Sequence, residues 1–154
     1  MGAKMALRDD LMGEIKEAMK AKAADRLSAL RLILNGLKER EIALRGDGVA
    51  ITDADELAVL AKMVKQRQES VKVYIEGARQ DLADKEIAEI KVIEEFLPKQ
   101  LTASEVEAAI AVAVAEVGAT SVKDMGRVMA VLKAKYTGSM DFGSVGALIK
   151  GRLA

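Results

Sequence analysis

Proline is scarce in this chain of 154 residues: it occurs once, as Pro98. Proline breaks helices because it lacks an amide donor and its ring clashes with the preceding turn. Alanine, leucine, glutamate and lysine, which are abundant here, are strong helix formers. The sequence therefore predicts an all-α protein with its one strong break around Pro98, since a helix usually ends before the residue that precedes a proline.

Four helices are predicted before this break, from apolar residues that recur every three or four positions. The first spans about residues 7–23. The second has Asp25 as a candidate cap and ends at the glycine pair 46 and 48. Thr52 or Asp53 caps the third, and Asp81 caps the fourth. Because the link between the second and third helices is short, we expect these two to form an antiparallel hairpin within an up-and-down bundle.

Three shorter helices are predicted after the break. Thr102 and Glu105 have the spacing of a capping box at the start of the fifth helix. Ser121 and Asp124 start the sixth helix, and Asp141 starts the seventh. The predicted organisation is an N-terminal hairpin or bundle of about four helices, residues 1–97, followed by a small three-helix domain, residues 98–154.

The absence of two residue types excludes several kinds of chemistry. Without cysteine, the chain has no disulfide, thiol nucleophile or thiolate metal site. Without histidine, it lacks the commonest general base and metal ligand. No metal or cofactor is predicted. Because no apolar run approaches the ~20 residues that span a bilayer, and no stretch resembles a secretory signal, no membrane partner and a cytoplasmic location are expected.

The net charge of zero conceals a separation of charges along the sequence. Residues 81–95 carry a net charge of −4 and residues 121–154 a net charge of +4. The basic segment could bind a polyanion, because clustered cations attract anions and steer their encounter. Alternatively, the cations near helix ends only offset the partial negative charge of free carbonyl groups. The six basic residues are Lys123, Arg127, Lys133, Lys135, Lys150 and Arg152.

Gly126 lies within the predicted sixth helix, where glycine costs ~1 kcal/mol relative to alanine. Close packing against helix five or seven is the favoured explanation. Close approach of an RNA backbone is the alternative.

Arg67 occupies a position on the third helix where a core residue belongs, in line with Leu60, Val64 and Val71. A buried guanidinium needs a partner, because an unpaired one costs several kcal/mol. We predict a structural ion pair with a carboxylate of the fourth helix, most favourably Glu86. A site for a small ligand is the alternative.

Four segments carry a resemblance to a known family: Lys123–Gly138, Asp141–Leu153, Phe96–Leu101 and Gly77–Leu82. Through them the chain resembles the GatB/YqeY family over essentially its whole length, in its stand-alone YqeY type. That family shares its C-terminal helical domain with the tail of the B subunit of tRNA-dependent amidotransferases. The resemblance implies that residues 1–97 form a YqeY-type domain and that residues 98–154 resemble the amidotransferase tail.

The resemblance also implies a function. It suggests a tRNA-associated accessory module linked to glutamine-dependent amide transfer onto aminoacyl-tRNA, with tRNA or a tRNA-charging or amidotransferase complex as partner. The six basic residues are then candidates to face RNA. The family carries the label of a carbon–nitrogen ligase, but the chain has no glycine-rich phosphate loop or amidase nucleophile motif, so it is not expected to catalyse this reaction alone. The alternative is a protein-interaction adaptor without an RNA role, suggested by the acidic fourth helix and the alanine-rich fifth helix.

Overall fold

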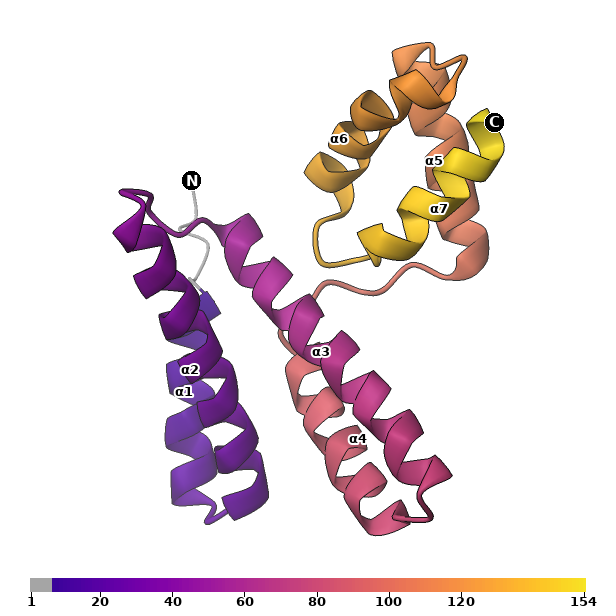
Figure 1. Ribbon diagram of the computed structural model, residues 1–154. Helices are drawn as coiled ribbons and strands as arrows, with labels where there is room; N and C mark the ends of the chain where they lie inside the picture. Colours follow the sequence, from indigo (N-terminus) through magenta and orange to yellow (C-terminus); the bar gives the residue numbers. More distant parts are fainter. Residues whose placement is uncertain (1–6) are drawn as a thin grey trace. The chain divides into compact units, whose positions relative to one another are not determined.

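The computed structural model describes residues 7–154, and within them it contains α-helices, one short 3₁₀ helix and no strand (Figure 1). The prediction of an all-α fold is confirmed. The elements are α1 Leu7–Lys20, α2 Ala24–Gly46, α3 Asp53–Glu76, α4 Gln80–Glu94, α5 Ala103–Val117, η1 Val122–Asp124, α6 Met125–Tyr136 and α7 Phe142–Leu153.

Several helix starts follow from side-chain caps that the sequence predicts. Thr52 accepts a hydrogen bond from the amide of Asp55, and the Asp55 carboxylate accepts one from the amide of Thr52, so a complete capping box begins α3. Thr102 and Glu105 form the same arrangement at α5. Asp141 caps α7 by accepting from the amide of Gly143.

Two predicted caps are wrong. Ala23 and Arg79 occupy the N-cap positions of α2 and α4, and neither makes a side-chain cap. Asp25 and Asp81 instead lie inside the first turns, where a carboxylate stabilises the partial positive charge of the helix start. Asp81 also forms an ion pair with Arg79 at 3.0 Å.

The chain divides into two compact units, one ending at Leu97 and one spanning Pro98–Ala154. We call them unit 1 and unit 2. Each has its own apolar core.

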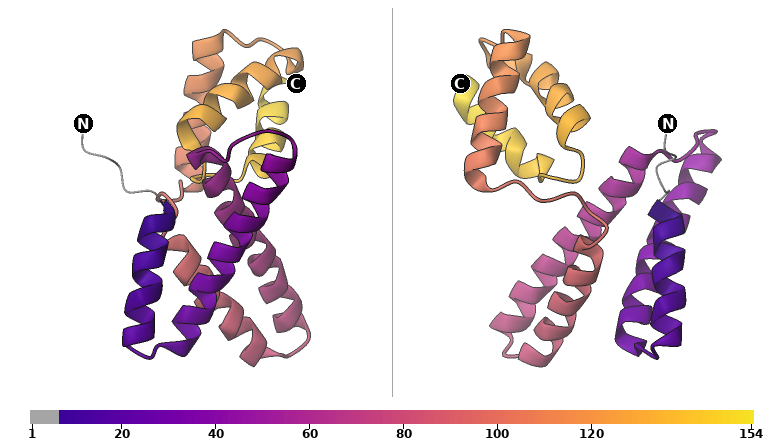
Figure 2. Two further views of the ribbon diagram at one scale, coloured as in Figure 1. Left: turned by 90° about the vertical axis from the view of Figure 1, so that its left-hand side faces the viewer. Right: turned by 180° about the vertical axis from the view of Figure 1, so that it is seen from behind.

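Unit 1 consists of two helix pairs. α1 packs along α2, and α3 packs extensively along α4, as the right-hand view of Figure 2 shows. The expected hairpin of α2 with α3 is therefore wrong as the main pairing: the two helices diverge from the loop that joins them (Figure 1). All four helices nevertheless contribute to one core, whose fully buried members are Leu11, Leu30, Ile33, Leu37, Leu60 and Ile93.

Unit 2 packs α5, α6 and α7 around a second core, with Ile110, Leu132 and Ile149 almost completely buried. The segment that enters this unit is fixed to the α6–α7 connection. The amide of Leu101 donates to the carbonyl of Ser139 at 2.9 Å, and the side-chain amide of Gln100 donates to the carbonyl of Gly138.

Among residues 7–154, no helix combines the length and the apolar character that crossing a bilayer requires.

Candidate nucleic-acid-binding surface

The six basic residues predicted to face RNA all lie in unit 2, and all six are exposed. One lies in the 3₁₀ turn η1, one in the first turn of α6, two in the last turn of α6 and two in the last turn of α7. In chain order they are Lys123, Arg127, Lys133 and Lys135, then Lys150 and Arg152.

Two of these cations border the outer face of α6. At 100° per residue, Arg127 and Lys133 lie at the two edges of the side opposite the buried Val128 and Leu132. Lys123 is exposed in the 3₁₀ turn just before α6. Arg127 and Lys133 are separated by about 9 Å along the axis, at ~1.5 Å per residue. We call this surface the α6 outer face. Its other exposed residues are small: Gly126, Ala130 and Ala134.

Gly126 corrects one expectation from the sequence. Close packing against helix five or seven does not explain it, because a Cβ atom added there would meet no atom within 4 Å. α6 begins at Met125, after a 3₁₀ turn, so Gly126 lies in the first helical turn and not in the interior. The close helix contact lies instead at Gly146, where a Cβ would be 3.4 Å from the Cε atom of Met125.

Two of the cations are held by neighbours. Arg127 pairs with Asp124 at 2.7 Å and donates to the carbonyl of Val117 at 3.1 Å. Lys135 projects toward α5 and pairs with Glu116 at 3.1 Å. A backbone hydrogen bond from Thr120, a side-chain hydrogen bond from Arg127 and a backbone hydrogen bond from Ser121 lower the pKa of Asp124 to about 2. Within the described residues, Lys123, Lys133, Lys150 and Arg152 have no ion-pair partner.

The six cations do not form one cluster. α6 and α7 run in opposite directions (Figure 1), so the last turn of α7 lies near the start of α6. Lys150 and Arg152 therefore belong to the end of unit 2 that carries η1. Lys133 and Lys135 lie at the other end.

Two of the acidic residues of helix α4 form ion pairs within unit 1. Arg67 Nε donates to Glu89 at 3.0 Å and lies 3.7 Å from Glu86. The hydrogen bond thus goes to Glu89, one turn beyond the predicted partner. These three side chains are about one fifth exposed or less, so the arrangement fits a structural ion pair and offers little access to a ligand.

Arg26 makes a second such contact. Its two terminal nitrogens hold the carboxylate of Glu95 at 2.7 and 2.9 Å, and Nη2 also reaches Glu14 at 3.0 Å. Because Arg26 lies in the first turn of α2, Glu14 belongs to α1 and Glu95 follows α4, the arginine joins the two helix pairs of unit 1. Its hydrogen bonds hold the pKa of Glu95 below the usual value.

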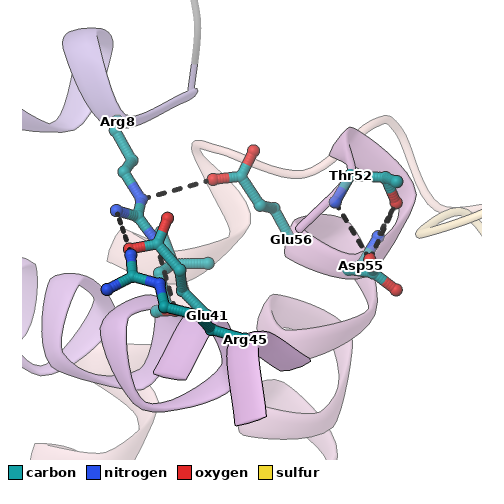
Figure 3. A network of polar contacts seen from close by, with 7 residues as sticks. Arg8, Glu41, Arg45, Thr52, Asp55 and Glu56 are labelled. Carbon is teal, nitrogen blue, oxygen red and sulfur yellow. Dashed lines mark hydrogen bonds and ion pairs between the residues drawn. The ribbon is translucent and has the colours of Figure 1, made fainter. Parts of the chain in front are cut away.

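Arg8 makes a third contact, where α1, α2 and α3 meet (Figure 3). It lies 3.3 Å from Glu41 and 3.5 Å from Glu56, and it donates to the carbonyl of Leu37. Glu56 is almost completely buried, and this burial raises the pKa of its carboxyl group. Within residues 7–154, the buried Nε of Arg8 has no hydrogen-bond partner, so its contact with Glu56 is an ion pair only.

Arg8 and Arg26 were not among the residues predicted from the sequence, although both carry the same signal as Arg67. Each lies in register with a buried stripe, one turn before its first apolar member. Arg8 precedes Leu11 in this way, and Arg26 precedes Leu30. A charged residue in line with a core stripe is therefore the sequence signal that could have predicted the other two inter-helix ion pairs of unit 1.

The described residues contain no group of three or more acidic side chains arranged to hold a metal ion. The exposed cations of unit 2 are groups that could bind an anion, and they lie in two places on that unit. The chain is therefore an all-α protein of two units, with exposed cations on its second unit.

Comparison with known proteins identifies its family. A family model described as Yqey-like protein matches residues 8–153, and the chain belongs to the YqeY family. Curated relatives carry the name "Altered inheritance of mitochondria protein 41, mitochondrial". The relative from Lachancea thermotolerans is 34% identical over 101 residues, covering 64% of this chain and 51% of the relative. The relative from Candida glabrata is 38% identical over 101 residues, covering 63% and 52%.

The chain thus spans about half the length of the curated relatives it matches. Their names contradict one expectation from the sequence. A cytoplasmic location was expected, but these relatives are named as mitochondrial proteins.

Proposed function

We propose that this protein is a tRNA-binding accessory module that contacts RNA through the α6 outer face. The observation that carries the proposal is that Arg127 and Lys133 border one exposed side of α6 whose other residues are small, with Lys123 exposed in the turn just before it. A surface without bulky side chains lets a sugar–phosphate backbone approach closely. Lys123 and Lys133, which have no carboxylate partner within the described residues, remain available to phosphate.

Recognition is expected through phosphate and shape. The aromatic residues of unit 2, Tyr136 and Phe142, are half-buried and pack against its core. They are therefore not available as platforms for base stacking, which sequence-specific readers of single-stranded RNA commonly use. Contacts to phosphate position an RNA without reading its sequence.

The role in amide transfer is proposed as accessory. The resemblance of unit 2 to the tail of the amidotransferase B subunit supports a link to glutamine-dependent amide transfer on aminoacyl-tRNA. The exposed cations of this unit suit the holding of tRNA, and we assign the bond-making step to a partner.

The proposal is tested by titrating the full chain with total tRNA at several salt concentrations. We expect micromolar binding that weakens steeply with salt. The double variant K123A/K133A should bind at least about tenfold more weakly, with a log–log salt slope shallower by about two, close to one unit per lost phosphate contact. Arg127 is left unchanged because it also holds the carbonyl of Val117.

A matched control changes two exposed lysines of unit 1, K62A/K72A, which removes the same charge elsewhere. This control should bind tRNA like the unaltered protein. A second variant, K150A/R152A, tests whether the end of α7 takes part. The absence of any tRNA binding at low salt would refute the proposal, as would equal losses in the α6 variant and the unit 1 control.

A protein-interaction adaptor remains the second candidate, favoured by the exposed acidic residues Asp84 and Glu94 of α4. It predicts a protein partner whose capture by the full chain survives nuclease treatment and is lost in D84K/E94K. Under the tRNA proposal, nuclease treatment should release whatever the full chain captures through RNA.

A further inference from the structure

Helices α6 and α7 carry the same sequence pattern. The segment Asp124–Lys133 reads DMGRVMAVLK, and the segment Asp141–Lys150 reads DFGSVGALIK. Both contain aspartate, glycine, valine, alanine and lysine in the same order and at the same spacing. The two helices are therefore two copies of one short repeat.

The structure gives equivalent residues of the two copies equivalent surroundings. Val128 and Val145 are both buried in the core of unit 2, and so are Leu132 and Ile149. The two helices contact each other and run in opposite directions (Figure 1). Because both cover the same core, an approximate two-fold axis between them relates one copy to the other.

The glycine, alanine and lysine of each copy are exposed. They follow one another at steps of four and three residues, so they lie along one line of their helix, away from the buried valine. We call these six positions the α6–α7 face, and they are Gly126, Ala130, Lys133, Gly143, Ala147 and Lys150.

The contact between the helices shows that the two lines are neighbours. A Cβ atom added to Gly146 would lie 3.4 Å from the methyl carbon of Met125 and 3.5 Å from that of Met129. Lys133 lies one turn after Met129, on the flank of α6 that is nearest to α7. Lys150 lies one turn after Gly146, on the flank of α7 that is nearest to α6. The two lysines are thus at opposite ends of one face, about 15 Å apart along the helix axes.

Both lysines are available to an anion. Within residues 7–154 neither has an ion-pair partner, and neither α6 nor α7 contains an acidic residue. Arg152 differs from them, because its equivalent in the repeat is Lys135, which projects toward α5 and pairs with Glu116. Arg152 therefore lies off the α6–α7 face.

Building on the RNA binding proposed above, we propose that the α6–α7 face binds double-stranded RNA across its minor groove. Lys133 contacts a phosphate of one strand, and Lys150 contacts a phosphate of the other. The two strands of a duplex are antiparallel and related by two-fold symmetry, as the two copies of the repeat are. The small residues between the lysines let the face approach the groove closely.

The form of the nucleic acid follows from two further observations. Proteins that read single-stranded RNA stack bases on aromatic side chains, but the four aromatic residues of this chain are all half-buried. The minor groove of A-form RNA is wide and shallow, whereas that of B-form DNA is only about 6 Å wide. A two-helix face therefore fits duplex RNA better than either single-stranded RNA or duplex DNA.

The test is fluorescence anisotropy of the full chain with an RNA duplex of about 16 base pairs. Each of its strands alone and a DNA duplex of the same sequence serve as comparisons. The RNA duplex should bind at least about tenfold more tightly than all three. K133A and K150A should each weaken duplex binding severalfold and to a similar extent, with a log–log salt slope shallower by about one.

Two matched comparisons locate the face. R152A removes the same charge as K150A from the same turn of α7 and should change duplex affinity by less than about twofold. A147L places a larger side chain on the floor of the face and should weaken duplex binding at least about tenfold. A115L makes the same change on the exposed side of α5 and should leave binding unaltered.

Equal affinity for the duplex and its single strands would overturn the inference. So would a loss in R152A as large as that in K150A, or a duplex affinity that A147L leaves unchanged. If total tRNA is bound and K123A/K133A weakens that binding while duplex RNA is not preferred, the inference fails and the proposed function stands. The absence of binding to tRNA and to the duplex at low salt would refute both.

Discussion

Each of three arginines in unit 1 is shared between two glutamates from other positions in the fold. Arg8 lies between Glu41 and Glu56. Arg26 likewise joins Glu14 to Glu95, and Arg67 joins Glu86 to Glu89. The planar guanidinium suits this role because it presents several donors in a fixed geometry. At Arg8 and Arg67, removing the arginine leaves two partly buried carboxylates close to one another.

The replacement R67M should therefore destabilise the protein by about 1–3 kcal/mol, below the full cost of a completely buried pair because the site retains some solvent. E89Q should cost more than E86Q, since the hydrogen bond of 3.0 Å goes to Glu89. Urea unfolding measures all three, and tRNA binding should be unchanged by R67M. An unaltered stability of R67M, combined with loss of tRNA or partner binding, would mean that the site serves a ligand.

The lowered pKa of Asp124 leads us to expect a specific dependence of the protein's stability on pH. Its pKa is lowered from 3.8 to about 2, so it contributes stability that is fully present above the unfolded value and is lost as pH falls through about 2. D124N should be less stable than the unaltered protein at pH 7, because asparagine lacks the charge that Arg127 and the amides of Thr120 and Ser121 bind. The difference should shrink between pH 4 and pH 2. Unfolding midpoints of both proteins, measured across this pH range, give the stability difference. A difference that does not change with pH would contradict a lowered pKa for Asp124.

At the scale of helices, the two central glycines of unit 2 play opposite roles. Gly146 is buried where α7 crosses α6, and an added Cβ would lie 3.4 and 3.5 Å from the methyl carbons of Met125 and Met129. Gly126 faces open space. G146A should therefore be tolerated, with a gain of up to ~1 kcal/mol from helix propensity.

A larger side chain distinguishes the two positions. G146L should destabilise the protein by about 1–3 kcal/mol through overpacking, whereas G126L should leave its stability close to that of the unaltered protein. Thermal unfolding of the four variants measures these differences. Equal effects of leucine at both positions would contradict the contact between α6 and α7.

Much of the helical content could be predicted from the sequence, because caps and apolar stripes are local signals. Thr52 and Thr102 cap as their spacing predicts. The pairing of the helices could not be predicted in this way, because it depends on tertiary contacts between residues far apart in the sequence. Three-residue links, 21–23 and 77–79, join the closely packed pairs, and the six-residue link 47–52 joins helices that diverge.

The candidate binding surface was only partly predictable, for a related reason. The list of exposed cations in unit 2 follows from the sequence, but their grouping depends on the direction of each helix. The sequence places Lys133 and Lys150 in one basic segment. The antiparallel course of α6 and α7 separates them to opposite ends of unit 2.

At the scale of the molecule, the two separate cores predict two responses to core damage. Leu132 is completely buried in unit 2, and its contacts belong to that core. L132A should lower the opening free energy of amides in α5, α6 and α7 by about 2–5 kcal/mol. The amides of α1–α4 should keep theirs.

Native-state hydrogen exchange resolves these contributions by region. The matched variant L37A lies in the core of unit 1 and should produce the reverse pattern. A loss of protection throughout residues 7–154 in both variants would show that the two units unfold as one.

The arginine contacts of unit 1 also affect how strongly guanidinium chloride and urea unfold the protein. Guanidinium ions have the same planar fork as the arginine side chain and compete directly for its carboxylate partners, in addition to screening charge as a salt. Urea does neither. Guanidinium chloride is ordinarily about twice as effective per mole as urea. For unit 1, in which six glutamates are held by Arg8, Arg26 and Arg67, the ratio should exceed two, with α1–α2 separating from α3–α4 first.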